Sequence, residues 1–147
     1  MSLDIRRIVT AFDENGKAIV KYDDISPHVI ETSSHVTVAN IWTTNDFPLP
    51  IDNEIDLGGA KVPRGPPAKH SIFRVVKFEP GNKRDMHVTA SIDYAIVMSG
   101  EVELKVDDGV VVEMKTGDVM VQQATIHGWR AVGTEPCVMA FILISTE

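Results

Sequence analysis

The chain has 147 residues, a formal net charge of −7 and a single cysteine, Cys137. This length fits one compact domain, and one cysteine excludes an intrachain disulfide and a cysteine-rich zinc site. The acidic balance argues against a nucleic-acid partner, and we interpret the short cluster Asn82–Asp85 as a solvated turn. Because no apolar run could span a membrane and the N-terminal residues do not resemble a secretory signal, we expect no membrane partner and a cytoplasmic location.

Short β-type segments separated by turn residues dominate the chain. Residues 6–12 and 17–22 flank the turn "DENG", which predicts an N-terminal hairpin with Gly16 at positive φ. No stretch has the 3.6-residue periodicity of a helix, so the pattern predicts an all-β barrel or sandwich. Further strands are expected at residues 35–42, 71–78, 92–98, 101–106, 110–114, 118–122 and 137–144.

The strand pattern stops between residues 43 and 70, a segment with five prolines and three glycines. A connection of this length in a small domain is typically functional or mobile. It is either a surface connection or a lid or partner-contacting arm. We therefore expect one domain over residues 1–147, in which the N-terminal hairpin and the segment 43–70 precede a motif-bearing barrel at 71–145.

The last expected strand, "CVMAFILI", is apolar on both faces. A strand buried on both faces needs a second layer beyond the barrel wall, most simply another subunit, so we expect a homodimer. Cys137 opens this run and is expected to be a buried, inert thiol.

Histidine and aspartate residues occur at two places where strands begin. Residues two apart in an extended segment face the same side, so His87 shares a face with Thr89, and His127 shares a face with Trp129. Asp93 alternates with small and apolar residues on the next strand, which predicts an inward carboxylate that needs a cation, a donor or a proton. If these strands line one barrel, His87, Asp93 and His127 converge. Such a set suits Fe(II), zinc, nickel or manganese.

Other polar or aromatic residues are candidates for the wall of a substrate pocket. Thr89 follows His87 on the same face, and Trp129 either stacks on a ligand or packs in the core. Gln122 and Gln123 occupy a strand where apolar residues would pack better, and we place Gln123 in the pocket. An inward Arg74 would favour a carboxylate substrate, whereas an outward Arg74 would be a surface residue.

The segments "GNKRDMHVTASIDYAIVMSG" and "GDVMVQQATIH" resemble the two sequence motifs of the cupins. The resemblance implies a double-stranded β-helix jelly roll and a metal site of three histidines and one glutamate. His87 and His127 stand at histidine positions, but Thr89 replaces the second histidine and Asp93 replaces the glutamate. The resemblance therefore implies either a metal held by His87, Asp93 and His127, or a metal-free pocket in which Asp93 pairs with a histidine.

The resemblance does not bring a reaction with it, and our first hypothesis is an enzyme that acts on a small polar organic molecule inside the barrel. Lyase, decarboxylase, isomerase and dioxygenase chemistry all occur among cupins, with iron, nickel, manganese or zinc as the metal. Without a metal, a histidine and Asp93 would move protons. A non-catalytic small-molecule-binding module is the alternative, and a structural dimeric β-domain with a vestigial pocket is a third.

Overall fold

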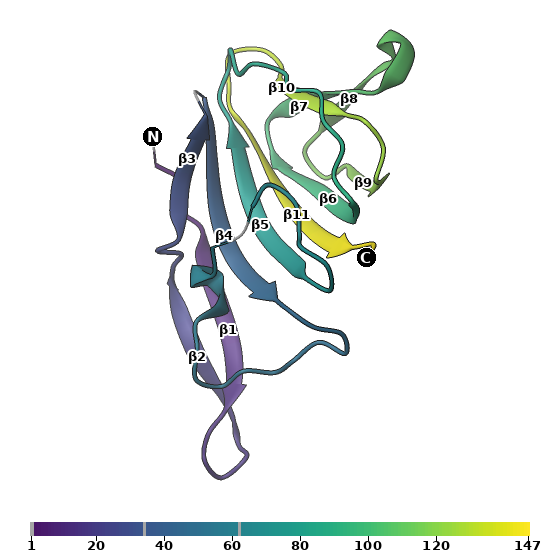
Figure 1. The fold of residues 1–147 in the computed structure, drawn as a ribbon. Coiled ribbons are helices and arrows are strands. Elements are labelled where there is room, and N and C mark those ends of the chain that lie inside the picture. Colours follow the sequence, from purple (N-terminus) through teal and green to yellow (C-terminus); the bar gives the residue numbers. More distant parts are fainter. Residues whose placement is uncertain (1, 34, 62) are drawn as a thin grey trace.

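A computed structural model describes residues 2–33, 35–61 and 63–147 of the chain (Figure 1). Strands account for most of its regular structure, as the sequence predicts. The elements are β1 (Arg6–Phe12), β2 (Ala18–Ile25), β3 (Val29–Ser33), β4 (Val36–Thr44), the 3₁₀ helix η1 (Leu57–Gly59), β5 (Ser71–Phe78), β6 (Ser91–Ser99), β7 (Glu101–Lys105), the 3₁₀ helix η2 (Asp107–Gly109), β8 (Val111–Lys115), β9 (Val119–Gln123), β10 (Gly128–Ala131) and β11 (Cys137–Ser145).

Two antiparallel sheets face each other and enclose the core. The larger sheet has the strand order β3–β4–β5–β11–β6–β9, and the smaller one has the order β10–β7–β8. The last strand, β11, pairs with β5 on one side and with β6 on the other. The last strand thus lies between two strands that follow each other in sequence, and the topology is the predicted all-β jelly roll (Figure 1).

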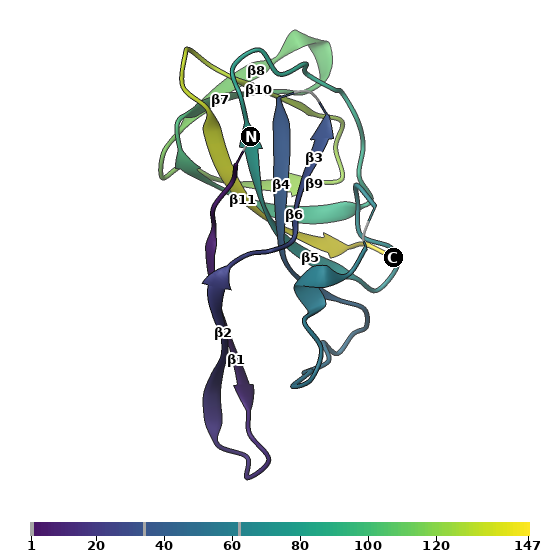
Figure 2. The ribbon, with the colours of Figure 1, turned by 90° about the vertical axis from the view of Figure 1, so that its left-hand side faces the viewer.

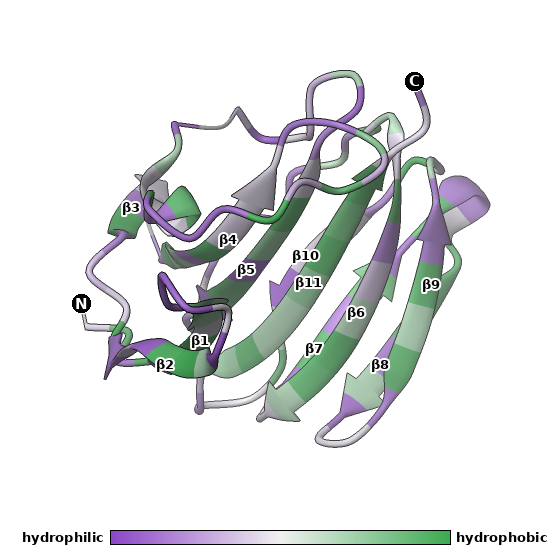
Figure 3. Ribbon diagram, turned by 90° about the horizontal axis from the view of Figure 1, so that it is seen from below, coloured by the Kyte–Doolittle hydropathy of each residue, from purple (hydrophilic) through white to green (hydrophobic). Residues whose placement is uncertain are grey.

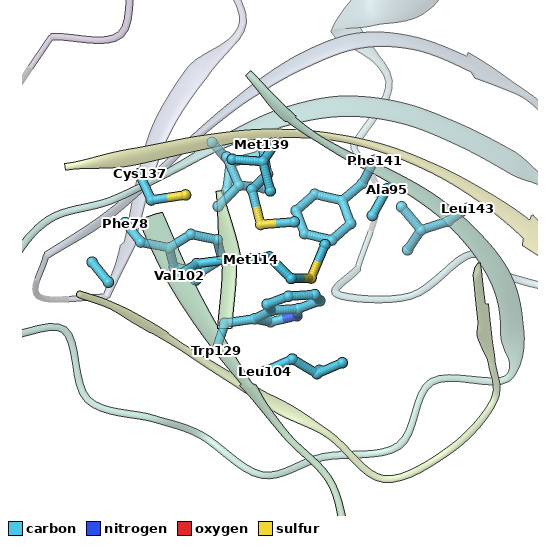
Figure 4. Close-up of a cluster of buried hydrophobic side chains, with 14 of the residues drawn as sticks. Phe78, Ala95, Val102, Leu104, Met114, Trp129, Cys137, Met139, Phe141 and Leu143 are labelled. Carbon is cyan, nitrogen blue, oxygen red and sulfur yellow. The ribbon is translucent and has the colours of Figure 1, made fainter. Parts of the chain in front are cut away.

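Aromatic side chains from three strands meet in the core between the sheets (Figure 4). Trp129 of β10 lies with its ring centroid 6.5 Å from that of Phe78 and 5.7 Å from that of Phe141. Cys137 is fully buried beside them, and burial raises the pKa of its thiol to about 11. The expected burial of this thiol is thus confirmed.

The N-terminal hairpin is confirmed, and it extends away from the barrel (Figures 1 and 2). Gly16 has the predicted positive φ, at 75°. One buried guanidinium ties the hairpin to the segment 43–70. Arg7 donates to Asp24 of the hairpin and, through Nη1 at 2.8 Å and Nη2 at 2.7 Å, to Asp56. His28 also lies against Asp56, with 3.0 Å between Nε2 and Oδ2.

Two strands were absent from the sequence expectation. The first, β3, ends in the polar residues "ETS" and pairs only with β4 at the edge of the sheet. The second, β10, has four residues directly after His127 and is held by its pairing with β7. Both are short strands with little local pattern, and β10 depends on pairing with a segment distant in sequence.

The outward face of β11 is covered in part by the chain itself. Ala140 packs in a second cluster with Leu3, Ile41 and Val75, so the N-terminal segment supplies part of the second layer that the sequence assigned to another subunit. Toward β6 and β9 the outer face of the sheet stays apolar and exposed (Figure 3), as at Tyr94. Among the described residues, no helix has the length and apolar character to cross a membrane.

Candidate functional site

A cavity of about 560 Å³ opens into the barrel between the two sheets. Six of the seven residues predicted for the site or the pocket contribute to its wall. They are Arg74, His87, Thr89, Asp93, His127 and Trp129. The structure therefore brings together the two motifs and the middle of β5, as the strand alternation predicts.

His87 and His127 are joined through their backbones. The amide nitrogen of His87 lies 2.9 Å from the carbonyl oxygen of His127, and the reverse hydrogen bond is 3.0 Å. This isolated β-bridge places the two imidazole rings with centroids 4.4 Å apart, at an angle of 56°. The separation of the rings is thus set by main-chain atoms that connect two distant segments.

Both imidazoles use Nδ1 to bind a backbone carbonyl. Nδ1 of His87 lies 2.8 Å from the carbonyl oxygen of Asp85, and Nδ1 of His127 lies 2.8 Å from that of Thr125. A carbonyl oxygen only accepts, so each Nδ1 carries the proton and each neutral ring keeps its lone pair on Nε2. Burial lowers the pKa of His127, which favours that neutral form. The two rings are therefore prepared to accept a proton or to bind an electrophile.

Asp93 is 4% exposed and has a hydroxyl as its partner. Ser91 Oγ donates to Asp93 Oδ1 over 2.5 Å, whereas no described histidine makes a hydrogen bond or an ion pair with this carboxyl. Burial raises the pKa of Asp93, against the opposing effects of the Ser91 hydrogen bond and of the charges of His127, Arg74 and His87. The expected Asp93–histidine pair is therefore not formed, and His127 does not gain the raised pKa that such a pair would give.

The expected three-ligand metal set is also not assembled. Within the parts of the chain that the structure describes, no group of three or more His, Cys, Asp or Glu side chains could hold a metal ion. Thr89 occupies the place of a histidine, and the short side chain of Asp93 is engaged by Ser91. Two imidazoles remain as donors, so the residues present do not fit a site with three protein ligands.

Arg74 points into the cavity, so the inward alternative is the correct one. Its Nη2 donates to the carbonyl oxygen of Arg64 over 2.6 Å, and Arg64 pairs with Asp85 at 2.5 Å. The residue after Arg64, Gly65, is so close to Thr89 that an added Cβ would lie 2.4 Å from the Thr89 methyl carbon. The proline-rich segment therefore reaches the cavity wall instead of only connecting strands over the surface.

Gln123 was placed in the pocket incorrectly. It is exposed on the outer face of β9, whereas its neighbour Gln122 is 4% exposed. Gln122 lies opposite Asp93 in the sheet and donates through Nε2 to the carbonyl oxygen, 2.9 Å away, and to the hydroxyl of Thr125. It therefore stabilises the turn that carries His127 without forming part of the cavity wall.

The cluster Asn82–Asp85 is more than the solvated turn that the sequence suggested. Asn82 is buried, and its Nδ2 donates to the carbonyl oxygen of Trp129 over 3.0 Å while its Oδ1 accepts from the amide of Ala131 at 2.8 Å. Lys83 lies at the cavity wall. The position of the cluster inside the first motif, only a few residues before His87, was the signal that could have revealed this role.

Comparisons with known proteins agree with this architecture. The profile of a family described as "Cupin domain" matches residues 74–144. The chain is 32% identical over 150 residues to "Cupin-domain-containing oxidoreductase srdD" of Neurospora crassa, covering 97% of this chain and 76% of that protein. It is 33% identical over 147 residues to "Cupin-domain-containing oxidoreductase virC" of Hypocrea virens, covering 96% and 76%.

A solved structure from Klebsiella pneumoniae subsp. pneumoniae, described as an uncharacterized conserved protein with a double-stranded beta-helix domain, has the same fold. It superposes with a TM-score of 0.56 and 22% sequence identity, covering 80% of this chain and 83% of that one.

Proposed function

Because the chain belongs to the cupin domain family, we propose that it is an enzyme that moves a proton on a small polar organic molecule bound in the barrel cavity. Relatives that are named oxidoreductases support an enzyme rather than a passive module. One observation carries the choice of chemistry. Two imidazoles with free Nε2 lone pairs share a cavity with a buried carboxyl.

In this proposal His127 is the base and Asp93 is the acid. Burial lowers the pKa of His127 and raises the pKa of Asp93, so the neutral imidazole and the protonated carboxyl are both favoured inside the cavity. His127 Nε2 takes a proton from the carbon beside a substrate carbonyl, and the electron pair of the broken C–H bond forms the enol double bond. Asp93 gives its proton to the carbonyl oxygen. Exchange is completed when the enol O–H proton returns to Asp93 and the imidazolium of His127 returns a proton to the same carbon. Where that carbon carries a hydroxyl, transfer of the hydroxyl proton to Asp93 and of the imidazolium proton to the former carbonyl carbon completes an isomerisation.

His87 is assigned a positioning role in this reaction. Its ring packs against His127, and its backbone forms the bridge that fixes the base. Its own Nε2 is free to accept a hydrogen bond from a substrate hydroxyl.

The names of the relatives favour a second candidate, an oxidoreductase, for which a metal is one source of redox chemistry. Iron, nickel, manganese or zinc would supply Lewis-acid or redox chemistry, and the adjacent Nε2 atoms of His87 and His127 are the donors on offer. We assign no step to a metal, because a third protein ligand is not assembled among the described residues. Elemental analysis of the wild type and of His87→Ala and His127→Ala separates the candidates, since stoichiometric metal lost in both variants would favour the second one.

The proposed proton transfer is tested by deuterium exchange in heavy water, followed by NMR. The probes are short straight-chain oxo acids, the matching amides and the matching ketones, with a chelator present throughout. The wild type should accelerate exchange beside the carbonyl of at least one probe, and His127→Gln should abolish that acceleration.

His70→Gln is the matched control for this experiment. Its Nδ1 also lies 2.9 Å from a backbone carbonyl, that of Ala68, but His70 is not part of the cavity wall. The His70→Gln variant should therefore accelerate deuterium exchange as the wild type does. A probe that binds in the cavity without accelerated exchange would instead identify the protein as a non-catalytic small-molecule binder.

We also propose that the chain forms a homodimer through the outer face of the larger sheet. Phe73, Tyr94 and Val121 lie in one row across neighbouring strands and are 40%, 46% and 59% exposed. A groove continues from Phe73 to exposed apolar residues of the hairpin, among them Ile8. A two-stranded hairpin is marginally stable alone, and a second copy offers the same apolar arm and face to cover both.

Sedimentation velocity over a range of concentrations tests the dimer. The wild type should sediment as a dimer and Tyr94→Lys as a monomer. Val112→Lys is the control, because Val112 is 49% exposed on the smaller sheet. A monomeric wild type at every concentration would show that this face is not an interface between copies.

A further inference from the structure

We infer that the ligand of the cavity is a small carboxylate whose carboxyl group is bound by Arg74. This inference rests on the proposed function for the position of the reacting atoms, but it concerns recognition, which can be measured separately. Its starting point is a cationic side chain in the cavity wall that forms no ion pair with a described acidic residue.

The guanidinium of Arg74 has unused donors. Its Nη2 donates to the Arg64 carbonyl, but Nε is buried without a hydrogen-bond partner, and Nη1 has none among the described residues. Burying a guanidinium without an anion is costly, and proteins usually provide a carboxylate at such a place. Arg74 lies in the middle of β5, a central strand of the sheet, so its guanidinium cannot leave the cavity wall without a change in the barrel.

Arg74 forms no ion pair with a described acidic side chain, although the nearby Asp93 favours its charged form. Asp85 is paired with the side chain of Arg64 at 2.5 Å, whereas Arg74 contacts the main-chain carbonyl of Arg64. Asp93 makes no ion pair with a described residue and is engaged by Ser91. Lys83 adds a positive charge at the wall, and burial lowers the pKa of His127, which favours its neutral form. The cavity therefore has an unbalanced positive charge when its carboxyl is protonated.

A carboxylate fits this arrangement better than a phosphate. A planar carboxylate matches the planar fork of one guanidinium. The remaining wall supplies Val76, Phe141 and Leu143, which suit a short hydrocarbon chain. A carboxylate fixed on Arg74 would hold the rest of such a molecule in the same cavity as His127.

The test compares acids with matched neutral molecules. Calorimetric titration of the wild type should show that a short oxo acid, such as 4-oxopentanoate, binds at least about tenfold more tightly than its primary amide. Arg74→Gln should remove this preference, whereas Arg74→Lys should keep part of it, because the charge remains without the fork. Arg6→Gln is the control, since Arg6 forms an exposed ion pair on the hairpin.

Folding does not obscure this result. Arg74→Gln removes a cation that has no described counter-ion, so its melting temperature should equal or exceed that of the wild type. Equal binding of acid and amide by the wild type, or an acid preference that survives in Arg74→Gln, would overturn the inference. So would tighter binding of inorganic phosphate than of acetate, or no binding by any acid of the series.

The two proposals fail in different ways. Exchange catalysed equally on acids, amides and ketones would support proton transfer and contradict carboxylate recognition. An acid preference that depends on Arg74, without accelerated exchange, would support recognition and contradict proton transfer.

Discussion

His87 and His127 are bonded to each other through both backbone amides, and their rings lie 4.4 Å apart. Main-chain atoms make this connection, so it does not depend on the imidazoles themselves. A substitution of either side chain is therefore expected to change the chemistry of the cavity while the barrel keeps its shape.

The first prediction concerns His127→Gln. Glutamine cannot act as a base, so the exchange rate should fall by about a hundredfold or more. Since the backbone bridge persists, the melting temperature should change little. Parallel exchange and thermal-denaturation measurements check both parts, and a large loss of stability would show that the ring supports the barrel.

A second prediction follows from the pKa shifts in the cavity. The base must be neutral, so activity should rise as the pH increases through the pKa of His127, which burial places below the ordinary 6.5. The acid must be protonated, so activity should fall as the pH increases through the pKa of Asp93, which burial places above the ordinary 3.8. Asp93→Asn should remove the alkaline limb of the rate profile. A profile whose alkaline limb is unchanged in that variant would exclude Asp93 as the acid.

Asp93 should also reduce the stability of the fold at neutral pH. Its pKa is higher in the folded chain than in the unfolded one, so the folded state binds more protons and stability falls as the pH rises between the two values. Asp93→Asn should therefore be more stable than the wild type by about 1 kcal/mol at pH 7, with little difference in acid. Urea denaturation at both pH values measures this, and a less stable variant would contradict it.

Much of the site follows from strand alternation alone. Because inward residues recur at every second position, His87, Thr89 and Asp93 could be assigned to one lining before any pairing was known. The error at Gln123 has a physical cause. Which glutamine faces inward depends on the register between β9 and β6, which pairs Gln122 with Asp93, and a change of one residue reverses the faces.

Two contacts in the cavity could not be read from the sequence. Strand alternation places Ser91 and Asp93 on one face of β6, but it does not show which partner the carboxyl takes. The Arg64 carbonyl meets Arg74 because of the path of an irregular segment, which leaves no periodic signal. The fold could be predicted because its strands and turns are local features of the sequence. The hydrogen-bond partner of Asp93 and the role of the segment 43–70 could not be predicted from local features.

Arg7 provides a prediction about stability outside the cavity. Its buried guanidinium, 1% exposed in its side chain, binds both Asp24 and Asp56, and Arg7 holds the pKa of Asp56 well below its usual range. Asp56→Asn leaves this cation underpaired and should cost about 3 kcal/mol of unfolding free energy at pH 7. Asp23→Asn, at the exposed pair with Arg6, should have little effect.

The same pair sets the response to acid. The stabilisation by Asp56 is complete above its ordinary pKa of 3.8 and declines as the pH falls toward the lower folded value. The cost of Asp56→Asn should therefore shrink in urea titrations carried out at progressively lower pH. A constant difference from pH 7 into acid would contradict the ion pair.

The contact between Gly65 and Thr89 gives a prediction about the loop. Gly65→Ala would place a carbon within 2.4 Å of the Thr89 methyl, so the segment must move and binding of the acid should weaken. Thr89→Ser removes that methyl, and the double variant should recover most of the lost affinity. Additive effects in this cycle would show that the two positions do not interact.

The bond from Arg74 to the Arg64 carbonyl has a consequence for comparisons among related chains. Every amino acid provides a main-chain carbonyl, so this contact constrains the path of the loop and not the type of side chain at position 64. A search for invariant side chains would overlook this loop, and the constraint would be visible only as a small residue at position 65. Among such chains, we expect the length and path of the segment to correlate with the kind of ligand better than its amino-acid sequence does.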